Sequence, residues 1–330
     1  MNLPFETKQR ELKIKKEAST DPRFGCNPSQ RPVDEIINYG IVNMDKPSGP
    51  TSHQVSDYVK KILSITKAGH SGTLDPGVTG VLPIALGNAT RIVDVLLKAG
   101  KEYVGVMHLH KEVDEKIILE AIETHFTGTI KQLPPLKSNV KRQLRPRNIY
   151  YFDILEVEGK DVLFRTGCQA GTYIRKLIHD LGAKLKVGAH MAQLRRTKAG
   201  PFDESTLFTL QDLADAYWYY KNEQSEKFIR KIIQPVENAV VHLPKIWVFD
   251  NCVDTLCHGA SLHLPGISQV ESGIKARDSV ALMTLKNELI ALGETKMSTE
   301  QIMGFQKGLS VKTTKVFMKP DTYPKIMVKK

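Results

Sequence analysis

The sequence lacks the features that indicate secretion, a disulfide framework or a membrane span. Its only cysteines are Cys26, Cys168, Cys252 and Cys257, and they have no framework spacing, which favours reduced thiols. The N-terminal stretch MNLPFETKQRELKIKK has no apolar centre of the kind a signal peptide needs. No apolar run is long enough to span a bilayer. These absences predict a cytoplasmic protein with no membrane partner.

Several enzyme motifs are absent as well. GHSG, residues 69–72, is followed by Thr73 where a nucleophile elbow needs glycine. No lysine follows the glycines at the spacing of a phosphate-binding P-loop. Cys252, Cys257 and His258 have no second ligand pair at zinc-finger spacing, so we expect no metal. Asp75 and Thr79 have the spacing of an aspartyl-phosphate motif, but the preceding residues are polar and no nearby carboxylate completes a magnesium site.

Positive charge is in excess. Lys and Arg number 47 against 36 for Asp and Glu, a formal net charge of +11. This surplus favours a polyanionic partner, most simply a nucleic acid. The stretch KQLPPLKSNVKRQLRPR concentrates cations between prolines, and either a solvated loop or a finger that grips phosphates fits it. The candidate RNA contacts there are Lys137, Lys141, Arg142, Arg145 and Arg147.

The hydrophobic patterns predict an α+β protein. An apolar stripe predicts a helix after Thr51 or Ser52, either of which can cap it. The run 81–87 indicates a buried strand, 101–109 alternates like a strand, and 205–231 reads as helical. Strand and helix signals mix without regular βαβ alternation, which argues against a doubly wound fold.

Changes in composition and pattern along the sequence also predict a chain of three parts. Residues 1–35 are polar and basic, with no clear apolar face, and form an N-terminal arm. Residues 36–241 carry the mixed pattern and form a main domain. From residue 242 to 330, short strands and turns predict a compact β-rich module.

Asp75 is the one acid in the stretch GHSGTLDPGVTGVLPIALG, residues 69–87. A loop of glycines either presents this carboxylate in a cleft or forms a tight turn. A lone carboxylate can act as a nucleophile when it is ionised, and a nearby guanidinium such as that of Arg175 favours the charged form. Tyr173 and Arg175 share a face if the chain is extended there, and diverge if a helix has begun. Tyr103 offers a ring suited to stacking on a base, or is a half-buried strand tyrosine.

Taken together, the motifs resemble those of pseudouridine synthases of the TruB family, and more closely those of its guide-directed branch, the archaeal relatives of dyskerin. The resemblance covers residue 38 to the end. Its matching stretches are MDKPSGPTSHQV, GHSGTLDPGVTGVLPIALGNATR, GKEYVGVM, PPLKSNVKR, GTYIRKLIHDLG, GAHMAQLRRTKAGPF and DTLCHGASLHLPGI. It implies a catalytic domain with a mostly antiparallel sheet, followed by a PUA domain, a small pseudobarrel that binds RNA. The arm would then pack on the PUA domain.

The resemblance implies isomerisation of uridine to pseudouridine in RNA, without a redox change or a cofactor. It makes Asp75 the catalytic aspartate, with the uracil flipped out of its stack to meet it. Attack at C1′, addition to C6 and removal of the C2′ proton remain alternatives for the acid. The resemblance also implies supporting roles for six residues in substrate binding. Tyr103 would stack on the base, Arg175 would pair with Asp75, and Tyr173 would contact the base and take a proton. His70 would hold the distorted strand, Leu194 would pack against the base, and Lys46 would support the loop.

The partners follow from the same resemblance. An H/ACA guide RNA would pair with the target RNA, rRNA or tRNA, while the PUA domain holds the guide's ACA end through Gly259, Ala260, Pro265 and Gly266. Three small proteins are implied: a zinc-ribbon-like Nop-family protein, a glycine-arginine-rich-protein homologue and a kink-turn-binding ribosomal-type protein. The Lys-rich tails of eukaryotic members are missing, which favours an archaeal, cytoplasmic protein. Two alternatives stay open: a synthase that modifies the T-arm of tRNA without a guide, and a non-catalytic RNA scaffold.

Overall fold

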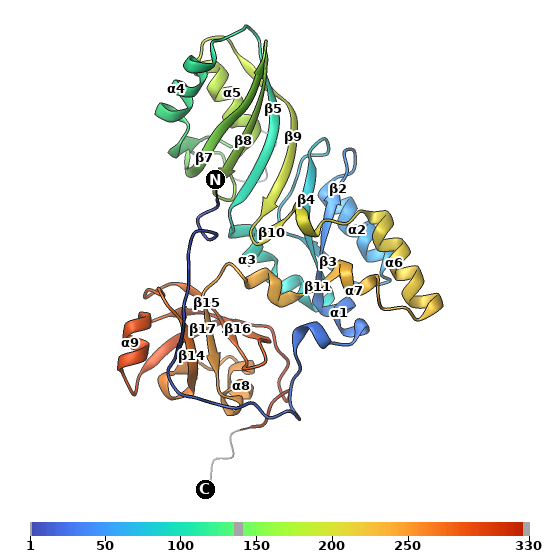
Figure 1. The fold of residues 1–330 in the computed structure, drawn as a ribbon, viewed down its shortest axis with the longest axis vertical. Coiled ribbons are helices and arrows are strands. Elements are labelled where there is room, and N and C mark those ends of the chain that lie inside the picture. The colour runs from blue at the N-terminus through green and yellow to red at the C-terminus, as the bar shows by residue number, and fades with distance from the viewer. Residues whose placement is uncertain (1, 135–140, 326–330) are drawn as a thin grey trace. The chain divides into compact units, whose positions relative to one another are not determined.

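The chain folds into two compact units, shown in Figure 1. The computed structural model describes residues 2–134 and 141–325. The first unit comprises Met1–Thr7 and Val42–Ile233, and the second comprises Lys8–Ile41 and Gln234–Lys330. Residues 2–7 group with the first unit, where Leu3 is fully buried and Glu6 pairs with Lys198. The sequence-based boundaries at 36 and 242 stay predictions.

The first unit is built on one sheet, to which ten strands contribute among the described residues. The strands are β2 (Gly40–Lys46), β3 (Ala68–His70), β4 (Thr79–Leu86), β5 (Lys101–Leu109), β6 (Gly128–Gln132), β7 (Arg145–Glu158), β8 (Asp161–Cys168), β9 (Ala189–Ala199), β10 (Phe202–Asp203) and β11 (Ile233–Pro235). Their order is β11-β2-β4-β9-β5-β8-β7-β6, with β3 beside β4 and β10 beside β9. β4 and β9 run parallel, whereas β5, β6, β7 and β8 pair antiparallel. The predicted α+β class and mostly antiparallel sheet are confirmed.

Helices cover this sheet. They are α2 (Ser52–Ile62), α3 (Val93–Lys98), α4 (Glu115–His125), α5 (Ile174–Lys184), α6 (Leu210–Glu223) and α7 (Ile229–Ile232). α4 and α5 pack on β7 and β9 around a buried apolar cluster. Thr51 caps α2 by accepting a hydrogen bond from the Gln54 amide, as predicted. The segment 205–231, predicted as helical, contains two separate helices, α6 and α7, because Gln224 adopts a left-handed conformation that ends α6.

The second unit has a sheet of its own, with seven strands among the described residues. They are β1 (Leu12–Ile14), β12 (Lys245–Val248), β13 (Leu262–His263), β14 (Ile267–Glu271), β15 (Ser279–Met283), β16 (Leu289–Thr295) and β17 (Leu309–Val316), and they lie in the order β1-β14-β12-β15-β16-β17-β13. Its helices are α1 (Val33–Tyr39), α8 (Asp250–Cys257) and α9 (Thr299–Gly304). This strand-rich, short-helix unit agrees with the predicted β-rich module.

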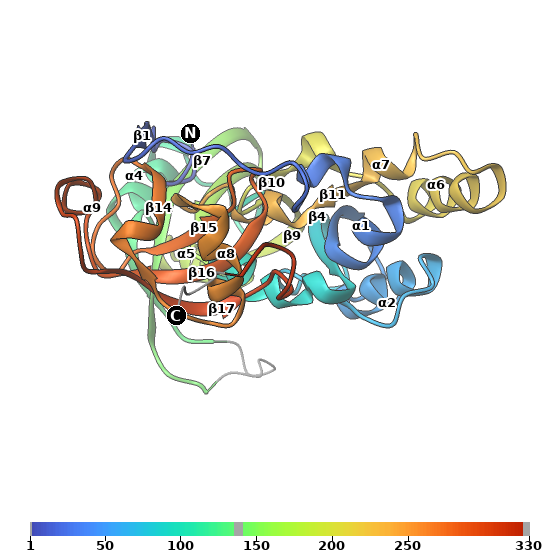
Figure 2. The same ribbon diagram turned by 90° about the horizontal axis from the view of Figure 1, so that it is seen from below.

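Within the second unit, the segment that precedes α1 runs along the edge of the sheet, as Figures 1 and 2 show. β1 pairs antiparallel with β14. The Lys15 ammonium donates to the carbonyls of Ile302 (2.6 Å) and Phe305 (2.7 Å). Arg31, almost fully buried, makes a two-pronged ion pair with Glu237, both N–O distances 2.8 Å. The segment is therefore an integral layer of this unit.

Candidate active site

Asp75 lies in the loop that joins the antiparallel strands β3 and β4. Its neighbours Leu74 and Val78 are buried in the apolar cluster, while the Asp75 side chain is 52% exposed. The fully buried hydroxyl of Ser52, at the start of α2, accepts from the Leu74 amide at 2.8 Å. The two apolar anchors and this hydrogen bond hold the loop so that the carboxylate stands out from it.

Lys46 supports the loop from behind. Its side chain is fully buried, and its ammonium donates to the carbonyls of Pro47 (2.9 Å), Pro76 (2.9 Å) and Val78 (2.8 Å). Burial lowers the pKa of Lys46, and the nearby charge of Asp75 opposes that shift. The three carbonyl acceptors satisfy all three donors, so the ammonium ties the backbone just after Asp75 to the loop at Pro47.

Arg175 forms an ion pair with the Asp75 carboxylate. α5 begins at Ile174, directly after an extended Tyr173, so of the two alternatives the helix has begun at Arg175. Both partners are more than half exposed, and an ion pair in that setting contributes at most about 1 kcal/mol to stability. The ion pair therefore fixes the positions of the two charges and adds little to the stability of the fold.

Tyr103 and Leu194 lie on neighbouring strands and pack against the same apolar cluster. Burial raises the pKa of Tyr103, which keeps the phenol protonated at neutral pH. Leu194 on β9 pairs with Gly105 on β5, and a Cβ at Gly105 would come within 2.8 Å of the Leu194 side chain. Glycine at this position leaves room for the leucine beside the tyrosine ring.

His70 ends β3, with its ring edge-on to His53 at a centroid distance of 4.7 Å. Both of its ring nitrogens are buried and have no hydrogen-bond partner among the described residues. Burial, aided by the charges of His53 and Arg196, lowers the pKa of His70 to about 4. His70 therefore presents a neutral ring with unused hydrogen-bonding capacity next to the Asp75 loop.

The basic segment lies at the start of β7. Lys141 and Arg142 are exposed, and the Arg147 guanidinium donates to the Gly171 carbonyl at 2.9 Å. Arg145 donates to the Lys141 carbonyl at 3.4 Å. None of these four cations takes part in an ion pair within residues 2–134 and 141–325. Lys137 lies outside the described residues.

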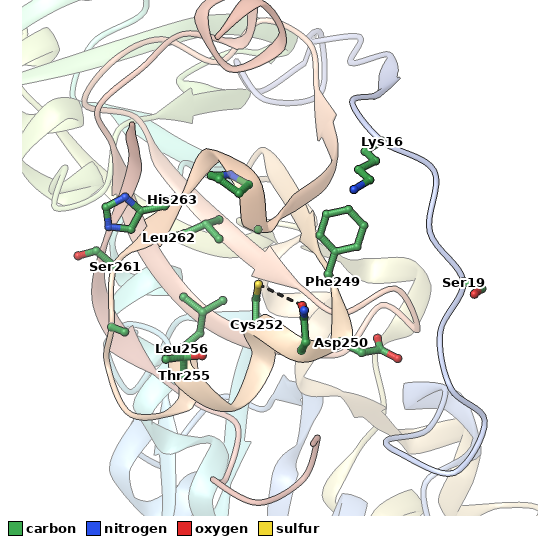
Figure 3. A pocket seen from close by; sticks show the side chains of 14 residues that line it. Lys16, Ser19, Phe249, Asp250, Cys252, Thr255, Leu256, Ser261, Leu262 and His263 are labelled. Atoms are coloured by element: carbon green, nitrogen blue, oxygen red, sulfur yellow. Dashed lines mark hydrogen bonds between the residues drawn. The ribbon is translucent and has the colours of Figure 1, made fainter. Parts of the chain in front are cut away.

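A second candidate site is a cavity of about 650 Å³ in the second unit, seen in Figure 3. Ala260, Pro265 and Gly266, three of the four residues expected to bind RNA there, line it, and Gly259 directly precedes the lining. Phe249 forms part of the wall (Figure 3), and the Lys16 ammonium lies 5.7 Å from its ring centroid. An aromatic ring beside an exposed cation is suited to a nucleotide, with a base on the ring and a phosphate on the ammonium.

Three buried polar residues were not predicted from the sequence. Gln132, at the end of β6, is buried and bonds the backbone of Tyr173. Lys101 is buried and caps α3 through three carbonyls, and burial lowers its pKa to about 7. Arg196 is the largest fully buried side chain among the described residues. No local pattern marks them, although alternation along β9 does place one of Arg195 and Arg196 on the buried face.

Comparison with known proteins follows the division of the chain. Models of the TruB family pseudouridylate synthase N-terminal domain and the tRNA pseudouridylate synthase B C-terminal domain match residues 60–174 and 175–241. The DKCLD (NUC011) domain and the PUA domain match residues 1–56 and 244–317. Within the described residues, no helix has the length and apolar content that crossing a bilayer requires.

Other proteins are similar to this chain over its whole length. Proteins named probable tRNA pseudouridine synthase B from Methanopyrus kandleri and Pyrococcus abyssi are 55% and 54% identical, each over 98% of this chain, and 95% and 97% of their own lengths are covered. A chain from a Cbf5–Nop10–Gar1 complex is 53% identical with a TM-score of 0.93. One from an H/ACA RNP bound to a substrate RNA containing 2′-deoxyuridine is 50% identical with a TM-score of 0.91. Both superpositions cover 98% of this chain and 99% of the other.

An α+β domain that presents one carboxylate beside an arginine and a tyrosine, joined to a PUA domain, defines an RNA-modifying enzyme. The chain belongs to the TruB family of pseudouridine synthases, which are RNA isomerases.

Proposed function

We propose that this chain is the catalytic subunit of an H/ACA ribonucleoprotein and isomerises uridine to pseudouridine at sites chosen by a guide RNA. The observation that carries the proposal is the Asp75 carboxylate, held half exposed by the buried Lys46 and paired with Arg175. Full-length similarity to a Cbf5 chain and to a chain of a substrate-bound H/ACA RNP supports the guided form of the reaction.

The reaction breaks the N1–C1′ bond, turns the uracil and joins C5 to C1′. The C5 proton leaves and N1 gains one, so no oxidant or reductant is needed. Asp75 acts on the flipped nucleotide, by attack at C1′, addition to C6 or removal of the C2′ proton. Each route needs an ionised carboxylate, and the ion pair places the Arg175 guanidinium directly beside it.

The surrounding residues have the supporting roles. Tyr103 stacks on the extruded uracil as a protonated phenol, and Leu194 packs beside it. Tyr173, fixed by Gln132 one residue before α5, contacts the base and takes the C5 proton. His70, whose ring nitrogens are buried, helps to hold the distorted strand through its neutral ring beside the Asp75 loop.

Two surfaces hold the RNA backbone. The basic segment of Lys137, Lys141, Arg142, Arg145 and Arg147 grips phosphates near the target. The cavity of the second unit, a PUA domain, takes the ACA end of the guide RNA through Gly259, Ala260, Pro265 and Gly266. The basic segment would supply affinity for the RNA backbone, and the cavity would position the guide RNA.

The partners we propose are small proteins. A chain 53% identical to this one assembles with Nop10 and Gar1, which fit the zinc-ribbon-like and glycine-arginine-rich partners. A kink-turn-binding ribosomal-type protein would mainly contact the guide RNA. The assembly would act in the cytoplasm of an archaeal cell, consistent with the archaeal relatives.

The second candidate function is modification of tRNA without a guide, favoured by the name of the curated relatives. Release of tritium from 5-tritiated uridine separates the two. The wild-type chain is assayed on a guided target with partner proteins, and on a tRNA transcript alone. Release that requires the guide supports the ribonucleoprotein, release from the bare transcript supports the alternative, and binding without release on either substrate indicates a non-catalytic scaffold.

A further inference from the structure

Arg196 lies on β9, between the strand that follows the Asp75 loop and the strand that carries Tyr103. On β9 it pairs with Gly80 of β4 on one side and with Tyr103 of β5 on the other. Its side chain is 1% exposed. A guanidinium at this depth cannot contact RNA, so its effects pass through the groups around it.

The guanidinium bonds the backbone on both sides of Asp75. Its Nε donates to the Val81 carbonyl at 2.7 Å, and its Nη2 donates to the Gly72 carbonyl at 3.4 Å. Gly72 has φ +130°, and a Cβ there would lie 3.6 Å from Nη1, so the chain turns directly over the arginine. One planar group thus ties the entry and the exit of the loop to β9.

The same group lies beside the Tyr103 side chain. The positive charge of Arg196 lowers the pKa of Tyr103, against the larger effect of burial. Burial lowers the pKa of Arg196, and Tyr103 opposes this. No carboxylate forms an ion pair with Arg196 in the described parts of the chain. A buried cation without a counter-ion costs stability, and a purely structural role would be served as well by apolar packing.

We propose that Arg196 is a positioning residue that holds the Asp75 loop and the Tyr103 ring in the arrangement needed for catalysis. The inference rests on the proposed function. Loss of the guanidinium releases the loop between residues 72 and 81, and Asp75 and Tyr103 then no longer share one fixed frame. A displacement of about 1 Å at a reacting group can cost about a hundredfold in rate, whereas RNA grip by the basic segment is untouched.

The test compares Arg196→Met and Arg196→Lys with wild type in the assembled complex with guide and target RNA. We expect Arg196→Met to lower the single-turnover rate of tritium release about a hundredfold, with the RNA dissociation constant within about twofold of wild type. Arg196→Lys keeps the charge but lacks the fork that reaches both carbonyls, so it should recover only part of the rate. Arg165→Gln, which removes a partly exposed arginine of β8 that pairs with Asp153 of β7, is the matched control and should keep the rate.

Hydrogen exchange of the free chain gives a second readout, independent of activity. In Arg196→Lys, the amides of Ser71, Leu74 and Val78, each hydrogen-bonded in the native loop, should exchange at least about tenfold faster, while α4 and β7 stay protected. A folded Arg196→Lys chain with wild-type rate and unchanged loop exchange would overturn the proposal, as would a rate loss matched by an equal loss of RNA affinity. Absence of release by the wild type would instead count against the proposed function.

Discussion

The side-chain amide of Gln132 grips the backbone of Tyr173 at both of its polar groups. Its Oε1 accepts from the Tyr173 amide at 3.0 Å, and its Nε2 donates to the Tyr173 carbonyl at 3.2 Å. Tyr173 is thereby kept extended until α5 begins at Ile174, which aims Arg175 at Asp75. A residue on β6 thus sets the start of a helix 41 positions later.

Gln132→Ala is therefore expected to slow catalysis more than it weakens RNA binding. It removes both hydrogen bonds and leaves the partly buried Tyr173 amide unpaired, at a stability cost of about 1–3 kcal/mol, while the Tyr173 carbonyl still accepts from the Leu177 amide. Gln132→Glu keeps the acceptor and loses the donor, so it should fall between wild type and Gln132→Ala. Denaturant unfolding measures the stability and single-turnover tritium release measures the rate. A Gln132→Ala rate equal to wild type would show that the contact is not needed for the reaction.

His70 predicts a pH dependence of stability. Burial lowers its pKa from an ordinary 6.5 to about 4 in the folded chain, so between those values the unfolded chain binds more protons. Stability from this group is fully present above pH 6.5 and is lost as the pH falls toward 4, by up to about 3 kcal/mol.

His70→Phe removes the titrating group while keeping a ring, and should flatten the stability curve over this pH range. His125→Gln, at the exposed end of α4, is the control and should leave the slope as it is. The free energy of unfolding in urea at pH 4.5, 5.5 and 6.5 provides the comparison. Equal slopes for wild type and His70→Phe would refute the assignment.

The basic segment predicts a change in the salt dependence of RNA binding. Replacing Lys141, Arg142 and Arg145 by glutamine removes three cations that have no acidic partner among the described residues. The slope of log affinity against log salt should become shallower by about 2 for single-stranded contacts. Filter binding over a roughly tenfold range of KCl concentration measures this slope. An unchanged slope would place the segment away from phosphates.

Lys16 predicts how the cavity of the second unit holds RNA. Its exposed ammonium lies beside Phe249 at the cavity, so Lys16→Gln should weaken binding of a guide hairpin that ends in single-stranded ACA about threefold to tenfold. Lys8→Gln, exposed in the same N-terminal segment, is the matched control. A hairpin without the single-stranded end should bind wild type and Lys16→Gln equally. Equal losses for both hairpins would assign Lys16 to nonspecific attraction.

Patterns local in sequence predicted much of the fold. Periodicity located α2, β4 and β5, and a cap signal placed the start of α2 at Thr51 or Ser52, because hydrophobic spacing and capping act within a few residues. The end of α6 at Gln224 was missed, since a left-handed residue other than glycine leaves no strong local signal. The prediction of a polar N-terminal arm missed the buried Leu3, because the burial of this residue depends on the tertiary fold.

The site was predictable where residue type itself carries the chemistry. Asp75 and Arg175 were paired from the sequence as carboxylate and guanidinium, and the structure brings them together across 100 positions. Gln132, Lys101 and Arg196 were not, because each acts by donating to backbone carbonyls, which every residue supplies. Such contacts can be identified only after the pairing of the strands is known.

The central claim is that Asp75 performs the isomerisation. Asp75→Asn removes the charge and keeps the shape, so RNA binding and folding should stay within about twofold and about 1 kcal/mol of wild type, since the exposed pair with Arg175 adds little stability. The direct measurement is tritium release from 5-tritiated uridine in a guided target, wild type beside Asp75→Asn. We predict release by the wild type and none by the variant. Release by Asp75→Asn at the wild-type rate would contradict the assignment of the catalytic residue.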